Sequence, residues 1–177
     1  TLFRSNAGVL LQTGNLTTQG LLNQGFWNFG SNATVNANAL AGSGTFCLSD
    51  STSSNCTGGD AAQVTFELAI DSQFDGVFKG SGGLTKTGNG ALLLTENQTF
   101  SGGLTVNNGT VIAGGTMSDD LDIVVGPNGT YVVGAADTVR SFVNNAPHSV
   151  VLDADLTTTA GFANNGRLVI NGDLLVN

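Results

Sequence analysis

Short apolar runs alternate with glycine and asparagine along most of the chain. In residues 80–115, "GSGGLTKTGNGALLLTENQTFSGGLTVNNGTVIAGG", the apolar runs are short and are bounded by Gly or Asn. Short runs that end at residues tolerant of positive φ predict short β-strands joined by tight turns. No amphipathic helical period occurs in this stretch. The pattern therefore predicts an all-β protein.

Three markers recur with a common period after residue 84. The first apolar runs of successive units open at Leu84, Leu104, Leu121, Val139, Leu156 and Leu174. The second runs recur at a similar interval, starting at Ala91, Thr110, Thr130, Ser149 and Arg167. An Asn-rich turn separates the two runs each time, with turn residues Asn89, Asn108, Asn128, Asn145 and Asn165. A shared period of about 17–20 residues is typical of a repeat architecture.

A unit of about twenty residues cannot bury an apolar face alone, but stacked units can. Each strand would pair in parallel with its equivalent one coil away. We therefore predict a β-solenoid with rungs of about 17–20 residues, in which the turn asparagines stack as a ladder. The residues expected in two inward columns are Leu84, Leu104, Leu121, Val139 and Leu156, and Leu92, Val111, Val132 and Val151. An array of β-hairpins is the competing interpretation, because Asn-Gly is also a hairpin signal.

The N-terminal third follows the pattern more loosely. The segment "LTTQGLLNQGFWNFG" is similar to "LTTTAGFANNGRLVING" near the C-terminus. This similarity predicts that some of Phe26, Trp27 and Phe29 face inward, and core packing is favoured over a ligand-stacking platform. The segments that begin at Val35 and Val64 predict further strands.

The period breaks at residues 41–63, a polar stretch that contains both cysteines. Cys47 and Cys56 enclose eight residues. This spacing suits a local disulfide and no common zinc pattern, with two free thiols as the alternative. A bridge would indicate an oxidising, exported setting. We expect a loop insertion on one face, where solenoids often make their contacts.

Composition and charge exclude several classes of function. The net charge of −8 and the five Lys and Arg residues argue against binding of nucleic acid or phosphate. No run of eighteen apolar residues occurs that could span a membrane, and no signal peptide opens the sequence. Because the sequence begins and ends within apolar, strand-like runs, we interpret it as a fragment that extends at both ends.

The residues that could carry chemistry are few and scattered. The one histidine, His148, lies in a turn, and a lone turn histidine is typical of a surface residue. The acidic candidates are Asp71, Asp75, Asp119, Asp120, Asp122, Asp153 and Asp155. "DSQFDG" begins like a calcium loop, but Gly82 stands where the twelfth-position Glu belongs. We expect no catalytic residue, cofactor or metal. A carbohydrate-active β-helix enzyme remains an alternative, and a broken Thr-x-Thr ladder disfavours an ice-binding solenoid.

Residues 74–115 read "FDGVFKGSGGLTKTGNGALLLTENQTFSGGLTVNNGTVIAGG". This segment closely resembles the passenger-associated repeat of bacterial autotransporters. Its first half is matched by Gly82, Gly83, Leu84, Lys86, Gly88, Gly90, Leu92 and Leu94. Its second half is matched by Phe100, Gly102, Gly103, Thr105, Val106, Gly109 and Val111, with Val where the family prefers Leu. The match covers about a quarter of the chain, and the motif also occurs in exoproteins that are secreted through a separate partner.

The resemblance implies a right-handed parallel β-helix at the outer surface of a Gram-negative cell. Residues 1–177 would be a single fragment of a longer passenger. Its partners would be its own C-terminal β-barrel translocator or a partner transporter, together with a host-cell or bacterial surface receptor or glycan, or a second copy. The implied function is adhesion or self-association, as in aggregation and biofilm formation. A pure spacer of a two-partner-secreted exoprotein is a further alternative.

Overall fold

The computed structural model describes residues 2–5, 9–12, 14–30, 33–51 and 55–177, and the regular structure within these ranges is entirely β. The strands are β1 (Leu2–Ser5), β2 (Val9–Gln12), β3 (Asn15–Asn23), β4 (Phe26–Phe29), β5 (Ala33–Ala41), β6 (Thr45–Cys47), β7 (Gln63–Leu68), β8 (Ser72–Phe74), β9 (Val77–Gly80), β10 (Gly83–Thr87), β11 (Ala91–Leu94), β12 (Thr99–Phe100), β13 (Leu104–Ala113), β14 (Asp122–Val133), β15 (Asp137–Asn144), β16 (Ser149–Leu152), β17 (Leu156–Asn164), β18 (Arg167–Ile170) and β19 (Leu174–Val176).

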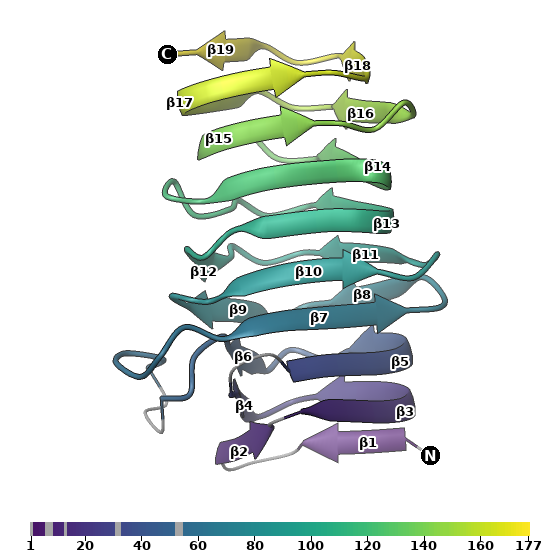
Figure 1. Ribbon diagram of the computed structural model, residues 1–177, viewed down its shortest axis with the longest axis vertical. Helices are drawn as coiled ribbons and strands as arrows, with labels where there is room; N and C mark the ends of the chain where they lie inside the picture. The colour runs from purple at the N-terminus through teal and green to yellow at the C-terminus, as the bar shows by residue number, and fades with distance from the viewer. Residues whose placement is uncertain (1, 6–8, 13, 31–32, 52–54) are drawn as a thin grey trace.

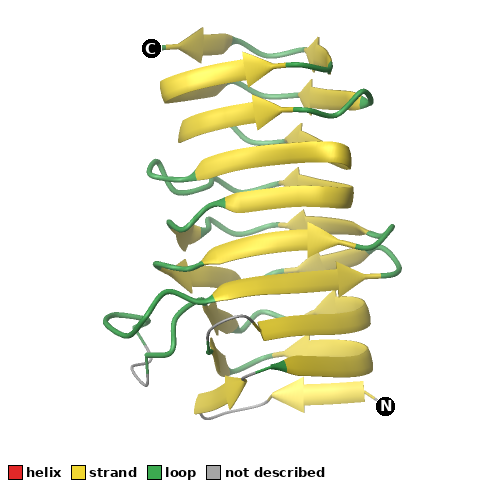
Figure 2. Cartoon of the chain, viewed as in Figure 1, coloured by secondary structure: helices red, strands yellow, loops and turns green. Residues whose placement is uncertain are grey.

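The strands wind into a right-handed solenoid with its coils stacked along the long axis (Figure 1). Three faces run along the stack. Face 1 contains β7, β10 and the first halves of β13 and β14. Face 2 contains β8, β11, β16 and β18 together with the second halves of β13 and β14. Face 3 contains β2, β4, β6, β9 and β12. Figure 2 shows loops at the corners between strands.

Every pairing between named strands is parallel, and its register sets the length of a coil. Leu84 pairs with Leu104, and Leu104 pairs with Ile123. These partners lie one coil apart, so the coils have the length that the sequence period predicts. The expected all-β solenoid is therefore confirmed. One coil is longer: Ala33 pairs with Val64, because the Cys-containing loop lies between them.

Aromatic side chains fill the core of the first coils. Phe46 is at their centre, with its ring centroid 5.1 Å from those of Phe74 and Phe78 and 5.4 Å from those of Phe29 and Phe66. Trp27 and Phe100 extend the cluster to either side and are fully buried. In later coils the core is mainly aliphatic, with Tyr131 and Phe142 as its large side chains.

Seven residues of the two expected columns are buried: Leu84, Leu104, Leu121, Val139, Leu156, Leu92 and Val111. The expected register of the first column is wrong, however. The partner of Leu104 is Ile123 rather than Leu121, and the partner of Leu156 is Asp137 rather than Val139. The later coils distribute their residues differently between turn and strand, so equal spacing in sequence does not give equal position.

Val132 and Val151 are not core residues, contrary to expectation. Val111 pairs with Tyr131, which is fully buried, and alternation along the strand turns Val132 outward. Val151 pairs with Val132 and shares its orientation, while Val150 and Leu152 are buried. Both valines are half-buried on the outer surface of face 2.

The core register makes a direct prediction for stability. Replacing Leu104 by Ala should lower the free energy of unfolding by about 2–5 kcal/mol, because the side chain is fully buried and its removal leaves a cavity. The adjacent Thr105 points outward, so Thr105→Ala should change stability by less than about 0.5 kcal/mol. Urea denaturation of the two variants measures both values, and equal losses would show that the register of β13 is wrong.

Candidate functional site

A disulfide-closed loop projects sideways from the solenoid between β6 and β7 (Figure 1). The insertion expected at residues 41–63 begins later in the structure than the sequence suggests. Residues 45–47 form β6, which pairs with β4 and β9 within face 3. The insertion proper therefore runs from Leu48 to Ala62, and Leu48 itself is buried against the body.

Backbone pairing closes the base of the loop. Ser49 and Ala61 form an antiparallel bridge, and the amide of Ala62 donates to the carbonyl of Leu48 over 3.2 Å. The Cys47–Cys56 disulfide is present and ties the loop back to β6, as expected. Beyond this base, Asp50, Thr57 and Asp60 are exposed. The loop therefore presents a small, polar, acidic surface on a fixed base.

A threonine ladder crosses four coils of face 1. Thr34 pairs with Thr65, Thr65 with Thr85, and Thr85 with Thr105, and all four side chains are partly exposed. The next position in the column is Val124, where the ladder ends. This column offers hydroxyl groups at the spacing of adjacent strands, about 4.8 Å.

The turn asparagines form two separate pairs, so the single continuous ladder expected from the sequence is wrong. Asn108 is in register with Asn128, and Asn165 donates from its Nδ2 to Oδ1 of Asn145 over 2.9 Å. The two pairs do not align, because Val125 pairs with Asn144 and this register places Asn128 and Asn145 at different positions. Asn89 is exposed in the turn before β11.

Lys86 is a structural residue. Its side chain lies in the core, where its register partners are Phe66 and Val106. The Nζ atom donates to the carbonyls of Thr87 at 2.7 Å, Gly88 at 2.9 Å and Asn108 at 3.3 Å. Burial lowers the pKa of Lys86 to about 8. The side chain therefore joins the corners of two successive coils, a role that the sequence pattern alone does not indicate.

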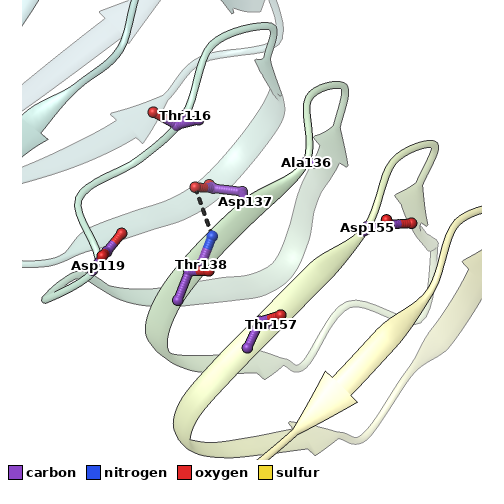
Figure 3. A pocket seen from close by; sticks show the side chains of 7 residues that line it. All are labelled: Thr116, Asp119, Ala136, Asp137, Thr138, Asp155 and Thr157. Atoms are coloured by element: carbon purple, nitrogen blue, oxygen red, sulfur yellow. Dashed lines mark hydrogen bonds between the residues drawn. The ribbon is translucent and has the colours of Figure 1, made fainter.

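A second candidate is an acidic hollow of about 340 Å³ beside β15 and β17 (Figure 3). Asp119, Asp137 and Asp155 line it from successive coils, and Thr138 and Thr157, which are register partners, also line it. Asp173 continues the series in the next hollow. These four aspartates are evenly spaced in the sequence. This even spacing could have predicted that the four side chains stack in successive coils. The acidic candidates named from the sequence do not include Asp137 and Asp173.

Asp137 is the unusual member of this series. Both carboxylate oxygens accept from the amide of Met117, at 3.1 and 3.0 Å, and Oδ1 also accepts from the amide of Thr138 over 2.9 Å. Burial raises the pKa of Asp137, and the hydrogen bonds from Met117 and Thr138 lower it. Burial has the larger effect, so the pKa is about 6. Asp137 therefore holds the turn that contains Met117 against β15. Within the described residues, no group of three acidic, histidine or cysteine side chains could hold a metal.

The remaining chemical candidates are dispersed over the surface. His148 is exposed, and Asp122 forms an ion pair with Arg140. Asp71 accepts a hydrogen bond from the amide of Ala91 over 2.8 Å, and Asp75 accepts one from Oγ1 of Thr95 over 2.8 Å. Both donors lie in the next coil. No helix long and apolar enough to cross a membrane occurs in the part of the chain that the structure describes.

Comparisons with known family models, with curated proteins and with solved structures found no match to this chain.

Removing the disulfide should weaken the protein without changing its fold. The bridge closes a loop of about ten residues, so Cys47→Ser with Cys56→Ser should lower the free energy of unfolding by about 2–3 kcal/mol at most. β6 keeps its pairing with β4 and β9, and the far-UV circular dichroism should therefore stay that of the parent. Loss of the β signal would show that the loop is integral to the stack.

Asp137 should make stability depend on pH. An unfolded Asp titrates near pH 3.9. Between about pH 4 and pH 6 the folded state thus retains a proton that the unfolded state releases, so the free energy of unfolding falls as pH rises through this window. Asp137→Asn should abolish this fall, which amounts to about 2 kcal/mol. The difference between parent and variant in urea midpoints at pH 4 and pH 7 measures it. Asp155→Asn, at an exposed site, is the control.

Proposed function

We propose that this chain is an adhesive segment at a cell surface, a solenoid body that carries a contact loop and mediates binding to other cells or to its own kind. The observation that carries the proposal is the polar, disulfide-closed loop from Leu48 to Ala62, held at its base on an otherwise regular stack. Loops inserted in solenoids commonly carry the contacts of the protein.

The chemistry of the outer surface supports this proposal. The Thr34–Thr105 ladder and the Asn108–Asn128 pair present hydroxyls and amides in rows, which suit hydrogen bonding to glycans. The Cys47–Cys56 bridge favours an exported location. The resemblance of residues 74–115 to the passenger-associated repeat adds the Gram-negative surface and secretion through an outer-membrane partner.

Two alternatives remain as outcomes of experiment. A pure spacer would use the same regular stack with no contact of its own. A carbohydrate-active enzyme would use the acidic hollow, where the carboxylates of Asp119, Asp137 and Asp155 line one surface.

The structure defines a cleaner deletion than the whole region 41–63, because that region includes β6. Residues 50–60 are replaced by Asn-Gly, a two-residue turn that suits the antiparallel Ser49–Ala61 bridge. Cys47→Ser accompanies the deletion so that no free thiol remains. Bacteria that display this variant should lose at least half of their host-cell binding or settling relative to the parent.

The matched control is the Cys47→Ser, Cys56→Ser variant, which keeps the loop and lacks only the bridge. Adhesion unchanged by the deletion would reduce the segment to a spacer. Cleavage of polysaccharide by the purified chain, abolished by Asp137→Asn, would instead establish the enzyme.

A further inference from the structure

Face 2 carries an aliphatic stripe on its outer surface, where a β-solenoid usually places polar residues. The stripe consists of Leu93, Ile112, Val132, Val151 and Val169. The register joins each of these residues to the next, so they stand in one straight column over five successive coils. All five are half-buried by their neighbours and none belongs to the core. No strand of the described chain packs over this column.

The stripe lies on strands with an unshifted register and has a hollow at one end. The register of face 2 runs without a shift from β8 to β18, whereas a shift interrupts the first half of β13 between Val106 and Asn108. At the N-terminal end, a hollow of about 310 Å³ is lined by Asp71, Gln73, Leu93 and Ile112, among others. At the C-terminal end, Val169 of β18 ends the stripe. Arg167 of the same strand ends the neighbouring column, which contains Ser149.

We propose that two copies of this chain associate through face 2, with their aliphatic stripes in contact and their solenoid axes antiparallel. The inference rests on the self-association included in the proposed function and gives it a surface and a geometry. The contact is symmetric about a two-fold axis that passes between Ile112 and Val132. Each of these residues therefore packs near the other in the second copy.

The spacing of the stripe favours a second copy over an unrelated protein. Both copies repeat at the distance between adjacent strands, about 4.8 Å, so contacts made in one coil recur in the others. The two-fold axis places Leu93 opposite Val151, and Gln73 opposite Val169. Val169 of each copy then enters the hollow at Gln73 of the other.

The flanking column supplies charge complementarity at both ends of the contact. Asp71 lies opposite Ala91, since the next residues, Ser72 and Leu92, are register partners. The column continues through Thr110, Thr130 and Ser149 to Arg167. The antiparallel two-fold brings Arg167 of each copy to Asp71 of the other. Within the described residues Arg167 forms no ion pair, so it is available for this contact.

The size of the stripe predicts weak association. Four residues of each strand and six coils span roughly 13 Å by 29 Å, which gives about 400 Å² on each copy. A stable complex buries about 800 Å² on each partner, so the pair should form at high protein concentration in solution. Many copies on apposed cell surfaces would strengthen it by multivalency.

The test uses the purified chain in sedimentation equilibrium from about 10 µM to about 1 mM, the range that suits an interface below standard size. The parent should approach the mass of a dimer as concentration rises. Val132→Lys, at the centre of the stripe, should raise the dissociation constant at least tenfold. Val143→Lys is the matched control, because Val143 is also a half-buried outward valine and pairs with Val124 on face 1. It should leave association unchanged.

Charge reversal tests the antiparallel arrangement. Arg167→Asp alone and Asp71→Arg alone each create two like-charge contacts and should weaken association about three- to tenfold. An equimolar mixture of these two variants restores two opposite-charge contacts and should return association to within about twofold of the parent. A parent that stays monomeric, equal effects of the two lysine variants, or a mixture without rescue would overturn the proposal. Each of these results leaves the loop-deletion experiment on adhesion unaffected.

Discussion

Parallel pairing of each strand with the strand one coil away is the interaction on which the whole structure depends. It joins every described strand to a neighbouring strand and fixes which residues share a column. The close stacking of corners follows from it. At Gly109, φ is +72° and a Cβ would lie 2.4 Å from the carbonyl oxygen of Gly88, so only glycine fits there. The glycine spacing of the sequence is a consequence of this stacking.

Buried polar side chains reinforce the corners by bonding to backbone one coil away. Asn23 donates to the carbonyl of Thr45, Gln98 to that of Gly76, and Asn144 to that of Arg167, over 3.1 to 3.2 Å. Lys86 uses the same geometry with Asn108. A corner has backbone groups that the sheet cannot satisfy, and these side chains supply the missing partners. Their substitution by apolar residues would leave those groups buried without hydrogen bonds.

The fold could be predicted from the sequence because apolar runs and glycines recur with the period of a coil. The orientation of individual side chains could not be predicted. Strand alternation has a period of two, so a shift of one residue exchanges inside and outside. Tyr131 carries a hydroxyl and Val132 is aliphatic, and hydrophobicity alone selects the wrong one for the core. Asp137 could not be identified from the sequence for a similar reason. It is the register partner of Leu156, and its charge gives no sign that it lies in an inward column. The disulfide was predictable because short spacing leaves few other uses for two cysteines.

The two proposed contact surfaces lie on different faces of the solenoid. The loop beyond Leu48 is polar and acidic, and it lies between β6 and β7 on the side of face 3. The stripe around Val132 is aliphatic and lies on face 2. Surfaces on different faces can be occupied at the same time. Under the two proposals, one copy would therefore bind a glycan or receptor through the loop while it pairs with a second copy through the stripe. Threonine would pair as well on this outer column, so strand pairing alone does not account for its aliphatic residues.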